Sequence, residues 1–111
     1  MAETNEPPAD TVRRELREEL GLDLRVGSML SVDWVSPHGP WDDQLNFIFD
    51  GGVMDACAVA NLLLGSELRA CEFCDVGQIQ QRLRPYVWRR VSTAFQALAT
   101  GRPQYLQDGY P

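Results

Sequence analysis

The sequence predicts one small domain of the mixed α/β (α+β) class. Apolar residues recur every four positions within residues 8–20, as in a helix that buries one stripe. Apolar and polar residues alternate within residues 30–34 and 45–49, as in half-buried strands. With 111 residues, the chain can bury one hydrophobic core but is too short for two independent domains.

The first helix is expected to run from Pro8 to Leu20. Its apolar stripe consists of Val12, Leu16 and Leu20. Proline suits the first turn of a helix, and Gly21 directly after the periodic run suits a left-handed C-terminal cap.

Two strands follow, and we expect them to pair in antiparallel fashion. Their apolar positions are Leu30, Val32 and Trp34 in the first strand and Leu45, Phe47 and Phe49 in the second. Ser31 and Asp33 alternate with the first set and are expected on the opposite face. The connection, SPHGPWDD, contains two prolines and a glycine, so it is predicted to be an irregular loop that can line a pocket.

The second half of the chain gives a mixture of weaker and stronger patterns. Residues 53–64 fit either a short helix or a loop, and residues 68–73 resemble a strand. Asp75 and Gln78 have the spacing of a capping box, which predicts a helix over residues 76–83.

After Pro85, a last helix is expected to end at Gly101. Its buried stripe is expected to contain Val87, Val91, Phe95 and Leu98. The domain is therefore expected to span residues 1–101, with an irregular tail over residues 102–111.

Charge and hydropathy exclude several classes of function. A net charge of -6 without a Lys/Arg-rich block would repel a nucleic-acid backbone, so no nucleic-acid partner is expected. No window approaches the roughly 18 apolar residues that span a bilayer, and the first ten residues are polar and acidic, unlike a signal peptide. We therefore expect no membrane association and a cytoplasmic location.

The cysteines and the single histidine give little indication of a metal site. Three cysteines without a secretion signal argue against a disulfide framework. Cys71 and Cys74 have a CxxC spacing, but no second pair completes a zinc site. His38 lies in the predicted loop without a spaced partner and is expected at the surface.

Three carboxylates in the first helix suggest a different kind of metal site. Glu15, Glu18 and Glu19 stand at i, i+3 and i+4 and therefore share one face. Such close carboxylates repel one another, so they call for a compensating cation or a fully solvated surface. A hard divalent cation such as Mg²⁺ takes oxygen ligands of this kind. The alternative is a water-facing helix with Glu and Arg pairs between its turns.

The spacing of this helix resembles the Nudix box, whose pattern is G-x5-E-x7-R-E-U-x-E-E-x-G-U with U aliphatic. Every specified position of its second half is matched, by Arg14, Glu15, Leu16, Glu18, Glu19, Gly21 and Leu22. Counting back seven unspecified residues from Arg14 reaches Glu6, the acidic position of the first half. The opening glycine would fall one residue before Met1. By this resemblance we expect the chain to lack the first strands of the fold, and one of its strands to present an unpaired edge.

Two further positions depart from the resemblance. Pro7 stands where the family often has a Ser or Thr that caps the helix, and losing that hydroxyl removes about 1 kcal/mol of cap stabilisation. Asn5 stands where many members have glycine; asparagine is the next best residue for a left-handed turn.

The resemblance implies both a fold and an activity. The implied fold is a mixed sheet sandwiched between helices. The implied activity is hydrolysis of the diphosphate linkage in a nucleoside diphosphate derivative with Mg²⁺ or Mn²⁺, and it is expected of a form that carries the first strands of the fold. It implies that Glu18 and Glu19 bind the metal, with Glu15 as a further ligand or as the base that acts on water. Arg14 is expected to be one of the catalytic residues: the resemblance implies that it holds a box glutamate in place. Glu6 is expected to support the loop.

Residues outside the box complete the candidate site. Some Nudix branches use a later glutamate as metal ligand or base. Glu67 is the best candidate here, with Asp42 and Asp43 as runners-up. Trp41, in the loop between prolines and aspartates, is the expected substrate contact. The expected partners are a small nucleotide-type molecule and, for a homodimer, a second copy of the chain.

Two other functions remain open from the sequence. One is a non-catalytic Nudix-like module that binds a nucleotide or a protein, and the other is an inactive, truncated gene product. The intact glutamates favour the enzyme, because a pure binding module has little reason to tolerate three repelling carboxylates.

Overall fold

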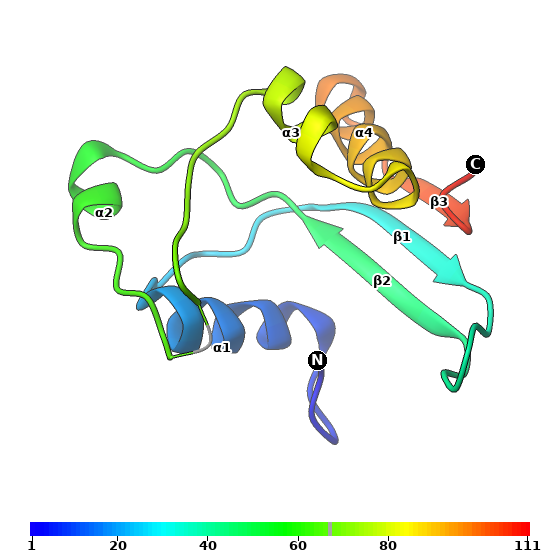
Figure 1. Ribbon diagram of the computed structural model, residues 1–111, viewed down its shortest axis with the longest axis horizontal. Coiled ribbons are helices and arrows are strands. Elements are labelled where there is room, and N and C mark those ends of the chain that lie inside the picture. The colour runs from blue at the N-terminus through cyan, green and yellow to red at the C-terminus, as the bar shows by residue number, and fades with distance from the viewer. Residues whose placement is uncertain (67) are drawn as a thin grey trace. The chain divides into compact units, whose positions relative to one another are not determined.

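The computed structural model describes residues 1–66 and 68–111 (Figure 1). They form two compact units. Unit 1 consists of Met1–Gly27 and Gly51–Phe73, and unit 2 consists of Ser28–Asp50 and Cys74–Pro111. The described residues contain four helices and three strands, which confirms the expected mixture of helices and sheet.

The helix of the box, α1 (Pro8–Leu20), has the predicted bounds. Pro7 takes an extended conformation before it and gives no side-chain cap, as its missing hydroxyl requires. Asn5 adopts a left-handed φ of 62°, the conformation for which asparagine substitutes for glycine. Gly21 ends the helix with φ 61°, and its N–H donates to the carbonyl of Arg17.

A later segment of unit 1 closes the carboxyl end of α1. The N–H of Leu63 donates to the carbonyl of Leu20 at 2.8 Å, and the N–H of Gly65 donates to the carbonyl of Glu19 at 2.7 Å. These bonds satisfy carbonyls that a helix end leaves without intrahelical partners. At Gly65 a Cβ atom would lie 2.6 Å from the carbonyl oxygen of Glu18, so only glycine allows this approach.

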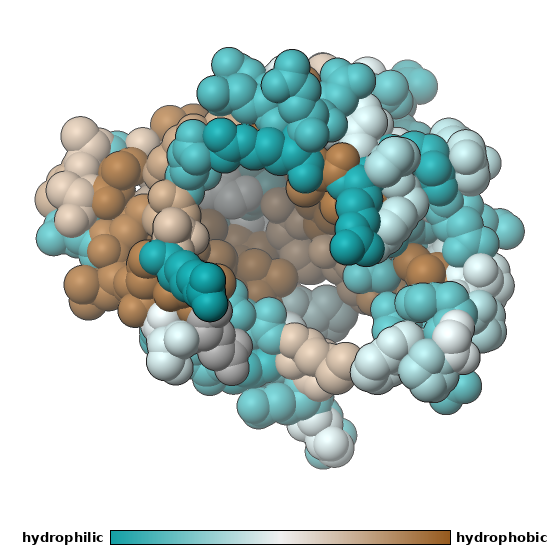
Figure 2. All heavy atoms as spheres, in the orientation of Figure 1, coloured by the Kyte–Doolittle hydropathy of each residue, from teal (hydrophilic) through white to brown (hydrophobic). Residues whose placement is uncertain are grey.

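Residues 53–64, which fitted either a short helix or a loop, contain the short helix α2 (Ala56–Ala60). The Asp55 side chain caps it by accepting from the N–H of Ala58 at 2.7 Å. Figure 2 shows hydrophobic residues gathered over this segment. The exposed ones include Val53, Val59, Leu63 and Leu64.

Unit 2 is built on a mixed sheet of three strands in the order β2-β1-β3. The antiparallel pairing of β1 (Met29–Val35) with β2 (Gln44–Phe49) confirms the predicted hairpin. The expectation of an irregular tail after residue 101 was wrong, because it contains β3 (Gln104–Gln107), which pairs in parallel with β1. A four-residue parallel strand has too little local pattern to be recognised before its partner is known.

Two helices complete unit 2. The capping box of Asp75 and Gln78 begins α3 (Val76–Arg82), as predicted. The last helix, α4 (Pro85–Thr100), has its proline in the first turn, ends at Gly101 as expected, and packs on β1 and β3. No helix among the described residues is long and apolar enough to cross a membrane.

The faces of β1 and α4 that are buried differ from those expected. Ser31 and Asp33 are completely buried, whereas Leu30, Val32 and Trp34 are only half-buried. On α4 the buried residues are Thr93, Ala94 and Ala97, whereas Val87, Val91 and Phe95 are half-buried and Leu98 is 51% exposed. An ion pair between Arg90 and Asp33 and the small side chains of α4 draw the polar face of β1 against the helix.

The expectation of a strand over residues 68–73 was also wrong. Residues 68–73 have no regular secondary structure. The alternation of apolar and polar residues in that segment therefore does not correspond to a strand or a helix. None of the three cysteines forms a disulfide bond within the described part of the chain.

Candidate functional site in the N-terminal box

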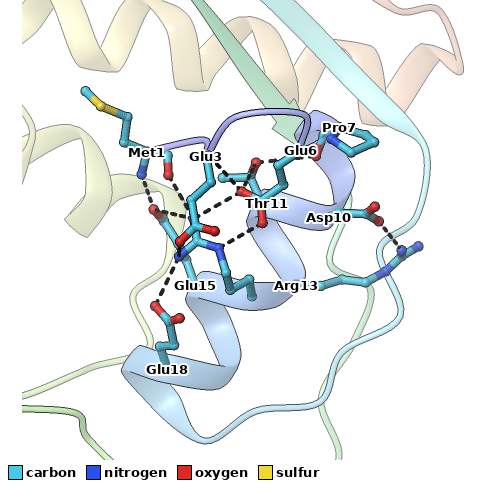
Figure 3. A network of polar contacts seen from close by, with 10 residues as sticks. Met1, Glu3, Glu6, Pro7, Asp10, Thr11, Arg13, Glu15 and Glu18 are labelled. Carbon is cyan, nitrogen blue, oxygen red and sulfur yellow. Dashed lines mark hydrogen bonds and ion pairs between the residues drawn. The ribbon is translucent and has the colours of Figure 1, made fainter.

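Arg14 is the centre of a polar network in unit 1, and Figure 3 labels its partners Met1, Glu6 and Glu18. Its Nε donates to one carboxylate oxygen of Glu6 at 2.8 Å, and its Nη2 donates to the other at 3.1 Å. Its Nη1 donates to Glu18 at 3.1 Å, and Nη2 also donates to the carbonyl of Met1. A forked guanidinium contact of this kind fixes both partners. The network thus joins the loop before α1 to the acidic face of the helix.

Glu6 is the most strongly perturbed carboxylate of this network. Hydrogen bonds from Arg14 first, and then from the N–H of Glu3 and the hydroxyl of Thr11, lower its pKa from 4.5 to about 2. The same contact with Glu6 raises the pKa of Arg14 further above its usual value. Both groups therefore stay charged throughout the physiological range.

The three box carboxylates line one pocket of about 390 Å³. Its lining residues are Arg14, Glu15, Glu18, Glu19, Gly65 and Ser66. Figure 3 shows Glu15 and Glu18 on the same side of α1, in successive turns. The close approach of Gly65 to the helix end brings the loop to the edge of this acidic face. The pocket is therefore a feature of unit 1 alone.

Two of the three carboxylates contact cations of the protein. Glu15 binds the N-terminal ammonium of Met1, and Glu18 binds Arg14. Within residues 1–66 and 68–111, no three His, Cys, Asp or Glu side chains come close enough together to hold a metal ion. Nearby positive charge offsets the repulsion between carboxylates, and Arg14 lies within 3.8 Å of Glu15 and 3.1 Å of Glu18. The donor chemistry fits a hard divalent cation, since three oxygen-bearing side chains line one pocket.

The candidates outside the box have different places in the structure. Glu67 lies outside the described residues, although its neighbours Gly65 and Ser66 line the pocket. Trp41 belongs to unit 2, where it is 55% exposed and its backbone pairs with that of His38. Asp42 and Asp43 are also in unit 2, and Asp43 accepts a hydrogen bond from the indole of Trp34 at 2.8 Å.

Sequence reasoning missed the contribution of residues 63–66 to the site. The box pattern specifies spacing within one segment, and nothing in it indicates which later segment closes the helix end. The one available signal was Gly65 itself, because an isolated glycine before a polar residue often marks a close backbone approach.

Comparisons with known proteins agree with the geometry of the box. The model of the NUDIX domain family matches residues 1–95. No curated protein and no solved structure matches the chain. The family match covers most of the 111 residues and includes the whole acidic helix with its Arg14 network. The chain therefore belongs to the NUDIX domain family.

Proposed function

We propose that this protein is a hydrolase that cleaves the diphosphate linkage of a nucleoside diphosphate derivative with Mg²⁺ or Mn²⁺. The observation that carries the proposal is the single pocket lined by Glu15, Glu18 and Glu19. Membership of the NUDIX domain family supports the same class of reaction. The substrate is a small molecule, because the pocket of about 390 Å³ suits a ligand group rather than a macromolecular surface.

In this proposal Glu18 and Glu19 hold the divalent cation, and Glu15 is a further ligand or the base. When bound, the cation neutralises phosphate oxygens and makes the leaving group better. A carboxylate serving as base takes one proton from the attacking water as the oxygen of that water bonds to phosphorus. The bond from that phosphorus to the bridging oxygen breaks, and the bridging oxygen leaves with the electron pair on the departing phosphate. Glu67 is a second candidate for this base, from its place next to Ser66 in the sequence.

Arg14 is a positioning residue in this scheme. Its guanidinium holds Glu6 and Glu18 at once, so it sets the orientation of a box carboxylate. A group that orients a metal ligand commonly changes metal affinity by about 10- to 100-fold.

The first test compares Glu18→Gln with the wild-type chain on a panel of nucleoside diphosphate derivatives in Mg²⁺ or Mn²⁺. Removing one carboxylate charge while keeping the shape should lower turnover by about 100-fold or more. Asp10→Asn is the matched control, because Asp10 is an exposed acid of the same helix that pairs with Arg13 and does not line the pocket. Equal turnover in wild type and Glu18→Gln would contradict a role for the box.

A non-catalytic module that binds nucleotides or a protein is the second candidate. It is favoured by the ion pairs that Glu15 and Glu18 already make with cations of the protein. Calorimetry with Mn²⁺ separates the two functions. For the enzyme we expect Mn²⁺ to bind the wild type and to bind Glu18→Gln at least about tenfold more weakly. Nucleotide binding that is independent of Mn²⁺ and unaffected by Glu18→Gln would favour the binding module.

A further inference from the structure

A second pocket, of about 460 Å³, lies entirely within unit 2, and none of its lining residues belongs to the box. It is formed where the β1–β2 hairpin and the residues after β3 meet the first turns of α4. Its polar lining includes His38, Gln44, Asn46, Arg89, Arg90 and Asp108. Hence one pocket contains two arginines, two carboxamides and an imidazole, all of which can donate hydrogen bonds.

Arg90 is held from behind by a buried carboxylate. Its Nε donates to Asp33 at 2.7 Å, and Asp33 is completely buried. The other oxygen of Asp33 accepts from the N–H of Gly109 at 3.0 Å, so the carboxylate itself cannot turn freely. Each oxygen of the Asp33 carboxylate thus accepts a hydrogen bond, as a buried charge requires. The guanidinium is consequently fixed in one orientation.

The terminal nitrogens of Arg90 remain available for a ligand. Among the described residues, the Arg90 side chain is bound by Asp33, and the contact is made through Nε. Arg90 is 17% exposed and lines the pocket. A guanidinium anchored through Nε presents two parallel N–H groups, the geometry that binds a phosphate or carboxylate group through two hydrogen bonds.

The lining of the pocket around Asp108 is held by contacts that do not involve Arg90. The Asp108 carboxylate accepts from the N–H of Ser36 at 2.8 Å and from its hydroxyl at 3.0 Å. These bonds lower the pKa of Asp108, so it stays charged. Arg89 lies over the ring of Tyr110, at 4.4 Å from its centre, and donates to the carbonyl of Asp108. The negative charge of Asp108 would repel an anion in the pocket, and the positive charge of the neighbouring Arg89 offsets that repulsion.

From this geometry we infer that the unit 2 pocket binds the oxyanion group of a small molecule, with Arg90 as its forked contact. The side chains of Gln44 and Asn46, two apart on β2, face the same side of the sheet and can donate to the same group. A ligand that is accepted here needs an exposed phosphate or carboxylate and little bulk. This site does not depend on hydrolysis at the box.

The test is a titration of the full chain, labelled with ¹⁵N, with inorganic phosphate and separately with acetate, followed by NMR. Sodium chloride at equal ionic strength is the reference. Saturable shifts at the amides of Ser36 and Gln44 and at the Arg90 Nε signal are expected. Tighter binding of phosphate supports a phosphate-bearing ligand, and tighter binding of acetate supports a carboxylate. The absence of saturable shifts with either anion would overturn the inference.

Gln44→Glu is the decisive variant. It places a negative charge in the pocket without touching the Arg90–Asp33 pair, so phosphate should bind at least about fivefold more weakly. Gln80→Glu makes the same charge change at an exposed position of α3 and should bind phosphate as the wild type does. Equal affinities in these two variants would overturn the site.

Arg90→Lys examines the fork itself. A lysine keeps a positive charge near Asp33 but offers no planar pair of donors, so phosphate binding should again weaken at least about fivefold. If this variant does not fold, Gln44→Glu and Gln80→Glu decide the question. Unchanged phosphate affinity in a folded Arg90→Lys would show that the fork is not used.

Discussion

Glu6 is the residue whose ionisation is most closely coupled to the fold of unit 1. Its pKa of about 2 lies below the 4.5 of the unfolded chain, because Arg14 and two further donors bind its charged form. A lowered pKa in the folded state means that the stabilisation is complete above pH 4.5 and is lost as the pH falls towards 2. Glu6→Gln should lower the free energy of unfolding at neutral pH, whereas near pH 2 the variant and the wild type should be about equally stable.

Urea unfolding at pH 6 and at pH 2.5 measures this prediction. The midpoint of the wild type should exceed that of Glu6→Gln at pH 6, and the difference should shrink towards pH 2.5. Glu3→Gln is the control, since Glu3 is 66% exposed and its ion pair with Arg14 is 3.7 Å long. A difference between wild type and Glu6→Gln that is the same at both pH values would contradict the coupling.

Asp33 shows why single residues on a correctly predicted strand were assigned to the wrong face. The alternation of Leu30, Val32 and Trp34 predicted that Asp33 would face water, and an unpaired acid in a core would be costly. Its partner Arg90 lies 57 positions away and gives no spacing pattern with it. By contrast, the box residues could be identified from sequence because their spacing is set within a single helix and its preceding loop.

At the scale of elements, Gly65 controls how the loop after α2 meets the end of α1. A Cβ atom there would be 2.6 Å from the carbonyl oxygen of Glu18, which is backbone and cannot rotate away. Gly65→Ala should therefore weaken the bonds from Leu63 and residue 65 to the helix end and destabilise the chain by about 1–3 kcal/mol. If the box is the active site, turnover should fall as well, since Gly65 lines that pocket.

Gly77→Ala is the matched control, because its Cβ atom would meet only the Asp75 side chain, at 3.4 Å, within the first turn of α3. Alanine favours a helix over glycine by about 1 kcal/mol, so this change should be neutral or stabilising. Hydrogen exchange at the Leu63 amide reports the contact directly. Unchanged protection of that amide in Gly65→Ala would show that the loop adjusts without loss.

Elements with local signals were predicted well, and elements that depend on distant partners were not. The ends of α1 and α3 and the C-terminal end of α4 were predictable, because caps and prolines act within a few residues. The short strand β3 exists only because β1 offers it hydrogen bonds, and residues 68–73 have strand-like alternation without such a partner in the described part of the chain. Pairing across the chain is not visible in local periodicity.

Considered as a whole, the sheet of unit 2 is held by contacts between the two ends of that unit's sequence. The parallel strand β3 brings Leu106 beside Asp33 of β1, and Leu106 is completely buried. Beyond β3, the N–H of Asp108 donates to the carbonyl of Trp34 at 2.8 Å. The C-terminal residues therefore supply both a strand and a large core side chain to unit 2.

Leu106→Ala should accordingly destabilise unit 2 by about 2–5 kcal/mol, the usual cost of a cavity left by a fully buried leucine. Tyr105→Ala is the comparison, because Tyr105 is the residue before Leu106 on the same strand, is 59% exposed, and leaves no cavity when its side chain is removed. Thermal melting with hydrogen exchange at the β1 amides measures both variants, and the β1 amides should lose protection in Leu106→Ala alone. Equal losses in the two variants would mean that β3 contributes through its backbone bonds to β1 rather than through the side chain that it buries.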